Sequence, residues 1–165
     1  MAGLSATTIL AASTGILGSA WTSGGQAMIS ILAVPGLLST TTPVPGQVLA
    51  QQWAGIYSQG KVLGPQAAVI SLLGYGYLLY GRSRQGRGWG DCLGAMGLTI
   101  GIVPFTLIFM DPTNQALLRV AEGSSSLGSE AVGELLVRWK WLNLTRSMFP
   151  LAGGLLGLYG LVGPW

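Results

Sequence analysis

Residues 138–150 read RWKWLNLTRSMFP and form the densest polar and aromatic stretch of the chain. If the stretch is helical, Trp139, Asn143 and Arg146 are spaced i, i+4, i+7 and share one face. Residues 151–165 then carry no charge at all. An arginine next to such a run is costly unless it faces protein, water or a ligand. The spacing therefore predicts a helix that brings an indole, an amide and a guanidinium together into an apolar layer.

A second interpretation applies to the outer residues of the same stretch. Tryptophans and long basic side chains are common at the ends of membrane helices, where they anchor the helix at the interface. Arg138, Lys140 and Trp141 fit that role as well as a functional one. For Arg146 we expect instead a side chain that points into the bundle, reaches Asn143 or Asn114, and faces a pocket.

The composition places the whole chain in the membrane class. Of its 165 residues, 50% are hydrophobic and only 8% are charged, whereas soluble domains are about a quarter charged. The net charge of +3 rests on eight basic residues with no sizeable basic patch, so a nucleic-acid partner is not expected. This composition predicts that the chain is embedded in membrane lipid.

Four apolar runs are long enough to cross a bilayer, at roughly 20 residues per crossing. They are residues 9–38, 62–80, 92–110 and 141–162. No soluble domain or long repeat lies between them. The sequence therefore predicts an all-α fold: one integral-membrane four-helix bundle with up-and-down topology, in a multi-pass protein of endomembranes.

Counting these spans also predicts which polar residues converge. The connection after the first span and the connection after the third lie on the same face of the membrane. Tyr57, Asp111 and Asn114 are then on the same side as Trp139, Asn143 and Arg146. Asp111 has two interpretations, a buried general base or the cap of a short helix opened by Pro112, and the cap is the favoured one.

The first span is polar in its middle, where residues 21–26 read WTSGGQ. Small and hydroxyl residues at such a depth allow close packing of helices. A large aromatic and an amide fit a packing seam poorly, so Trp21 and Gln26 are equally well interpreted as lining a cavity.

Histidine is absent and Cys92 is the only cysteine of the chain. Protein-bound zinc, copper and non-haem iron depend mainly on imidazole and thiolate ligands. No dinucleotide-binding fingerprint is present either. We therefore expect no metal and no cofactor.

Two motifs carry a resemblance to a known family. They are Pro112-x-Asn114-x-x-Leu117 after the third span and Trp139-x-x-Leu142-Asn143-x-x-Arg146 at the start of the fourth. With these motifs, its length and its span order, the chain resembles the anthrone oxygenase-like proteins, small four-span membrane proteins of aromatic polyketide pathways.

The resemblance implies oxidation of a lipophilic anthrone to its anthraquinone by molecular oxygen, without an added cofactor. An anthrone has an activated methylene, and loss of its proton gives an electron-rich anion. Such a reaction requires a base, a positive group and an aromatic slot. We assign anion stabilisation to Arg146, orientation of substrate oxygens to Asn114 and Asn143, ring stacking to Trp139 and Tyr57, and the base to Asp111.

Two other functions remain open from the sequence. One is a non-catalytic membrane module that docks pathway enzymes or holds a lipophilic intermediate, and the other is a small transporter. Coupled transport usually needs ionisable groups at mid-depth, which argues against the transporter. The sequence leaves the oligomeric state undetermined.

Overall fold

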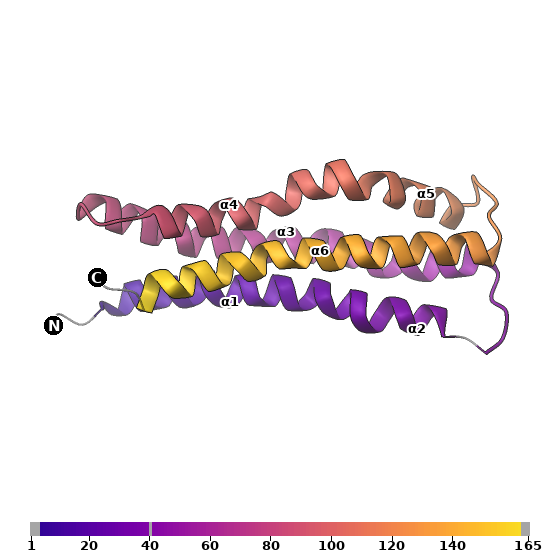
Figure 1. The fold of residues 1–165 in the computed structure, drawn as a ribbon, viewed down its shortest axis with the longest axis horizontal. Coiled ribbons are helices and arrows are strands. Elements are labelled where there is room, and N and C mark those ends of the chain that lie inside the picture. Colours follow the sequence, from indigo (N-terminus) through magenta and orange to yellow (C-terminus); the bar gives the residue numbers. More distant parts are fainter. Residues whose placement is uncertain (1–3, 40, 163–165) are drawn as a thin grey trace. The chain divides into compact units, whose positions relative to one another are not determined.

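The computed structural model describes residues 4–39 and 41–162, and these residues form helices without any β-strand (Figure 1). The all-α prediction is confirmed for this part of the chain. The elements are α1 (Ala6–Met28), η1 (Ile29–Ala33), α2 (Val34–Leu38), α3 (Gly46–Arg84), α4 (Gly90–Phe105), η2 (Thr106–Met110), α5 (Asp111–Ala121) and α6 (Ser129–Val162).

Two compact units divide these helices. Unit 1 consists of the described residues of Met1–Gly24, Gly64–Ile102 and Ser147–Trp165, and unit 2 consists of Gly25–Leu63 and Val103–Arg146, without the undescribed residue 40. Every predicted site residue except Trp21 falls in unit 2.

The two η elements are π-helical turns, and each one ends two residues before a proline. The backbone N–H of Val34 donates to Ile29 O before Pro35. The backbone N–H of Asp111 donates to Thr106 O before Pro112. A proline inside an α-helix clashes with the carbonyl four residues earlier, and a wider turn relieves that clash. The chain thereby stays helical through both prolines.

The second π turn corrects the predicted role of Asp111. Asp111 is the first residue of α5, but the N-cap position is Met110, no side-chain capping bond is present, and the chain is helical without a break from Gly90 to Ala121. The N-cap interpretation of Asp111 is therefore wrong. That interpretation assumed that Pro112 opens a separate short helix.

The core of unit 1 surrounds Tyr75, which is fully buried. Its hydroxyl shares a hydrogen bond of 3.1 Å with Ser19 Oγ and donates one of 3.4 Å to Gly153 O. A Cβ atom at Gly15 or Gly157 would lie within 2.7 Å of the Tyr75 ring. The phenol therefore fits only because two helices present glycine to it.

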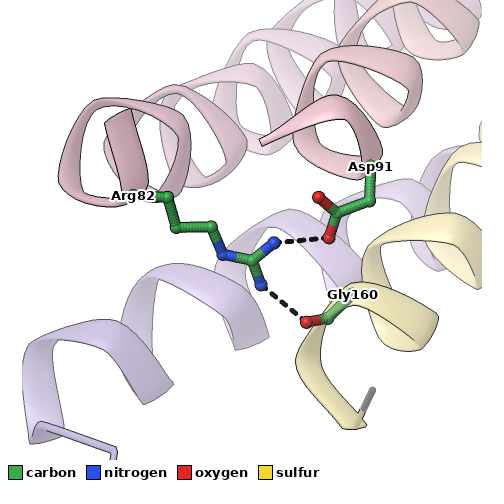
Figure 2. Close-up of polar contacts among 3 residues, drawn as sticks. All are labelled: Arg82, Asp91 and Gly160. Atoms are coloured by element: carbon green, nitrogen blue, oxygen red, sulfur yellow. Dashed lines mark hydrogen bonds and ion pairs between the residues drawn. The ribbon is translucent and has the colours of Figure 1, made fainter. Parts of the chain in front are cut away.

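Unit 1 also contains a buried ion pair, drawn in Figure 2. Arg82 Nη1 donates to Asp91 Oδ2 at 2.5 Å, and Arg82 Nη2 donates to Gly160 O at 2.6 Å. The guanidinium thus links α3, the start of α4 and the end of α6 through one side chain. Arg82 is therefore a buried structural residue of the last turn of α3.

Two helices of the described chain are long and apolar enough to cross a membrane, namely Gly46–Arg84 and Gly90–Ala121. The helix Gly46–Arg84 begins well before residue 62, where the second span was predicted to start. Length and composition are the only support for either crossing, so the count of four spans stays a prediction.

Candidate functional site

The face predicted on α6 is present, and each of its three residues bonds to a different helical segment. Trp139 Nε1 donates to Asn114 Oδ1 of α5 at 2.8 Å. Asn143 Nδ2 donates to Ser30 Oγ of η1 at 2.8 Å, and Arg146 Nη1 donates to Thr106 Oγ1 of η2 at 3.1 Å. Side-chain hydrogen bonds from this face therefore connect α6 to α5, η1 and η2 within unit 2.

Asn143 is almost completely buried, and its amide is fully engaged with the protein. Besides Ser30, Nδ2 donates to the backbone carbonyl of Gln26 at 2.8 Å. Its Oδ1 accepts a 2.7 Å bond from Arg146 Nη2. Both amide N–H groups are thus used, so Asn143 acts on the guanidinium rather than donating to a ligand.

Arg146 is held by two neutral oxygens, Thr106 Oγ1 and Asn143 Oδ1. Its Nε is buried and has no hydrogen-bond partner in the described chain, nor does any described carboxylate form a salt bridge with it. The expected contact with Asn143 is therefore confirmed. The expectation that Arg146 faces a pocket stays a prediction.

Such a guanidinium is suited to binding an anion. It offers five N–H donors in a planar fork, and two of its three nitrogens are fixed in place by the protein. Because neutral oxygens hold it, its positive charge is not cancelled. Charge-assisted bonds to a developing oxyanion are about twice as strong as neutral ones.

Three aromatic side chains, Trp53, Tyr57 and Trp139, form a cluster in unit 2. Trp53 stacks on Tyr57 with ring centroids 4.9 Å apart and meets Trp139 edge-on at 5.6 Å. The phenol of Tyr57 is close enough to both Asp111 and Arg146 for their charges to act on it. The aromatic cluster and the polar face of α6 are therefore neighbours.

Asp111 is half-buried at the point where η2 meets α5. Its Oδ1 accepts a long 3.4 Å bond from Gln115 Nε2. Thr113 and Asn114, which follow it, are both buried. The role of Asp111 as a base stays a prediction.

Trp21 and Gln26, predicted as a pair, are placed differently. Gln26 lies in unit 2, is 8% exposed, and its Oε1 is buried without a hydrogen-bond partner in the described chain. Trp21 lies in unit 1 with 77% of its surface exposed. The backbone carbonyl of Gln26 accepts from Asn143 of α6, whereas Trp21 is an exposed residue of unit 1.

Ser30, Thr106 and Trp53 were missed from the sequence as parts of this site. Ser30 and Thr106 each lie in a π turn a few residues before a proline, and such turns are often found at functional sites. A hydroxyl residue shortly before a proline in an apolar run was the available signal. Trp53 and Tyr57 precede Lys61 in the sequence, an arrangement typical of interfacial anchors, yet Trp53 is fully buried.

No group of three or more metal-ligating side chains comes together within residues 4–39 and 41–162. The described acidic residues are dispersed, and the one cysteine is buried in unit 1. The site of unit 2 therefore consists of amides, hydroxyls, indoles, a phenol, a carboxylate and a guanidinium.

The anthrone oxygenase family model matches residues 53–156, which is more than half of the chain. The chain belongs to the anthrone oxygenase family. The matched region contains Trp53, Tyr57, Asp111 and Asn114 together with the whole face of α6.

Curated relatives of this anthrone oxygenase family member match over most of its length. Anthrone oxygenase AgnL2 of Paecilomyces divaricatus is 36% identical over 159 residues, covering 93% of this chain and 96% of the relative. Anthrone oxygenase dmxR16 of a Cryptosporiopsis species is 38% identical over 87% of this chain and 81% of the relative. Noranthrone monooxygenase of Aspergillus flavus is 32% identical over 90% and 71%.

No solved structure matches the chain. The relatives named as oxygenases favour an enzyme over a docking module. This member of the anthrone oxygenase family is accordingly an oxygenase.

Proposed function

We propose that unit 2 oxidises an anthrone-type aromatic polyketide to its anthraquinone. The overall reaction consumes one anthrone and one molecular oxygen and gives one anthraquinone and one water. One oxygen atom becomes the new ring carbonyl and the other leaves in the water. The observation that carries the proposal is the partly buried guanidinium of Arg146, with which no described carboxylate forms a salt bridge.

The first step is loss of a methylene proton. The electron pair of that C–H bond spreads through the rings to the carbonyl oxygen, which becomes phenolate-like. Arg146 donates to this oxygen, while Asn143 and Thr106 keep the fork in position. A preorganised donor of this kind lowers the barrier because the charge develops only as the proton leaves.

Asp111 is the proposed proton acceptor. It is half-buried, it is not used as a helix cap, and it acts electrostatically on the same phenol as Arg146. A carboxylate placed near a guanidinium but not paired with it can take a proton from a substrate lying between them.

Asn114 and the aromatic cluster bind the flat ring system in this proposal. Asn114 Oδ1 is occupied by Trp139, so its amide NH₂ is assigned to a substrate oxygen. Tyr57 and Trp139 offer aromatic surface, and Gln26 offers an acceptor for a phenolic hydroxyl.

Oxygen then reacts with the electron-rich anion itself. The ring carbon bonds to oxygen and forms a peroxide, which takes the proton held by the base. Loss of the second methylene proton supplies the electron pair for the new C=O bond, while the O–O bond breaks and releases water. Every electron comes from the substrate, so no protein-bound cofactor is required.

The proposal places the site in an endomembrane protein with four spans and up-and-down topology. The two apolar helices Gly46–Arg84 and Gly90–Ala121 support membrane insertion. A lipophilic anthrone partitions into lipid, so a membrane site meets its substrate at a raised local concentration.

Purified protein in lipid nanodiscs, mixed with an anthrone and oxygen, tests the function. Quinone formation is followed by absorbance against empty nanodiscs, since anthrones also oxidise slowly by themselves. A rate proportional to protein concentration is expected. A rate equal to that of empty nanodiscs refutes the proposal and favours a non-catalytic docking or holding role.

A further inference from the structure

We infer that the indole N–H of Trp53 donates a hydrogen bond to a phenolic oxygen of the substrate. Trp53 thereby favours anthrones that carry a phenolic oxygen over anthrones that lack one. The inference rests on the proposed function and adds to it a residue that determines specificity.

The first observation is that Trp53 Nε1 has no acceptor. Trp53 is 0% exposed and is among the largest fully buried side chains of the described chain. Its Nε1 is buried and makes no hydrogen bond to any described residue. Trp139, the other indole of the cluster, donates to Asn114 at 2.8 Å. The same cluster thus pairs one indole N–H and leaves the other without a partner.

A buried indole N–H without an acceptor, such as that of Trp53, is unusual and calls for a physical explanation. The great majority of buried polar groups are hydrogen-bonded, because an unpaired one loses its bond to water without compensation. An indole N–H can only donate, so what completes it must be an acceptor. A substrate oxygen is such an acceptor, and it arrives only when the substrate binds.

The ring of Trp53 is also fixed by its neighbours. Tyr57 stacks on it with an interplanar angle of 15°, and Trp139 meets it at 82°. A ring held on two sides keeps its N–H in one direction without a bond. A donor that is oriented in advance favours specificity, because little further ordering is needed on binding.

Three further buried atoms of unit 2 lack partners in the described chain, namely Gln26 Oε1, Thr113 Oγ1 and Arg146 Nε. Together with Trp53 Nε1 they give unit 2 buried donors and acceptors that no described residue pairs. A flat aromatic ligand with oxygens on its rim, some as hydroxyls and some as carbonyls, complements that mixture. The carbonyl oxygen is assigned to Arg146, which leaves a phenolic oxygen for Trp53.

The test replaces Trp53 by benzothienylalanine, in which sulfur takes the place of the indole N–H with nearly unchanged shape. Two substrates are compared in nanodiscs, unsubstituted anthrone and a dihydroxyanthrone with both hydroxyls beside the carbonyl. The isostere is expected to lower kcat/KM for the dihydroxyanthrone by about 3- to 10-fold and for anthrone by less than about 2-fold. Its melting temperature is expected to stay equal or to rise, because no protein bond is lost.

The same isostere at Trp139 is the matched control. There the N–H is paired, so its loss leaves Asn114 Oδ1 buried without a donor and the melting temperature is expected to fall. Opposite thermal responses at two indoles of one cluster distinguish a ligand-directed N–H from a structural one.

Two results would overturn the inference. One is an equal loss of kcat/KM for both substrates, or no loss for either, as a bound water on Nε1 would give. The other is a lower melting temperature for the Trp53 isostere, which would reveal a protein acceptor.

If the wild-type protein oxidises neither anthrone, the proposed function fails, and binding of dihydroxyanthraquinone decides the inference separately. About 3- to 10-fold weaker binding by the Trp53 isostere sustains it. Equal binding, or no binding to the wild type, refutes it.

Discussion

Replacing Arg146 by lysine keeps the positive charge and removes the planar fork. In the structure, Nη2 bonds to Asn143 Oδ1 at 2.7 Å and Nη1 bonds to Thr106 Oγ1 at 3.1 Å. One ammonium on a different stem cannot hold both oxygens and also donate to a substrate oxyanion in the same geometry. We therefore expect Arg146→Lys to lose most of the activity while the protein stays folded.

The size of the loss follows from the bonds involved. A hydrogen bond to a charged group is worth about 1.5–3 kcal/mol. If the lysine variant loses one such bond to the anion in the transition state, kcat/KM falls about 10- to 150-fold, at 1.36 kcal/mol per tenfold. Arg146→Ala loses at least as much activity. It also leaves the buried Asn143 Oδ1 unpaired, which lowers the free energy of unfolding by about 1–3 kcal/mol.

The assay is quinone formation from one anthrone by wild type, Arg146→Lys and Arg138→Lys in the same nanodiscs. Arg138 lies on α6 as well, but it is exposed, so its lysine variant is expected to be fully active. Full turnover by Arg146→Lys, with an unchanged melting temperature, would show that Arg146 is only an anchor.

Four further outcomes are expected. Asn143→Ala should lower both kcat/KM and the free energy of unfolding, the latter by about 2 kcal/mol, because Arg146 and Ser30 lose their partner; a melting curve equal to wild type would contradict this. Asp111→Asn should lower kcat about 100-fold or more without changing the melting temperature, and an active variant would exclude Asp111 as the base. Asp91→Ala should destabilise the protein by about 3 kcal/mol in denaturant unfolding, because it removes the carboxylate that forms the salt bridge with the buried Arg82 guanidinium. Chelators should leave quinone formation unchanged, and loss of one bound metal per chain together with activity would refute a metal-free site.

The polar face of α6 was predictable because it depends on helical periodicity alone. Trp139, Asn143 and Arg146 are spaced to share one face, and each bonds to another helical segment. The helical class was predicted because the chain has few charged residues and long apolar runs, which is typical of helical membrane proteins. Helix counting also predicted that Tyr57, Asp111 and Asn114 lie near this face. Asn114 contacts Trp139 directly and Tyr57 stacks on Trp53, which contacts Trp139, whereas the position of Asp111 beside the face stays a prediction.

The partners of Asn143 and Arg146 were not predictable in the same way. Ser30 and Thr106 reach them from π turns, and a π turn depends on how a helix accommodates a later proline rather than on residue spacing. The same effect made Asp111 look like a cap. Local sequence rules assume a regular α-helix and therefore misplace residues where one turn is widened.

The contact partners of Arg82 and Trp53 could not be predicted from the sequence either. Arg82 lies in a basic run, which is typical of an exposed turn, yet Asp91 and the Gly160 carbonyl draw its guanidinium into unit 1. Trp53 precedes Lys61, which is typical of an interfacial anchor, yet Tyr57 and Trp139 enclose it. In both cases a deciding contact comes from another helix, α4 or α6.

In the proposed function, Arg146 stabilises the anion of a bound anthrone. The most direct measurement is the visible absorption spectrum of an anthrone bound to the protein in nanodiscs without oxygen. The wild-type protein is expected to shift the bound anthrone to the longer-wavelength spectrum of its anion at neutral pH, and admission of oxygen should then convert it to quinone. Arg146→Lys should leave most of the bound anthrone in its neutral form. A neutral spectrum in the wild type, or the same anion spectrum in both proteins, would contradict the account.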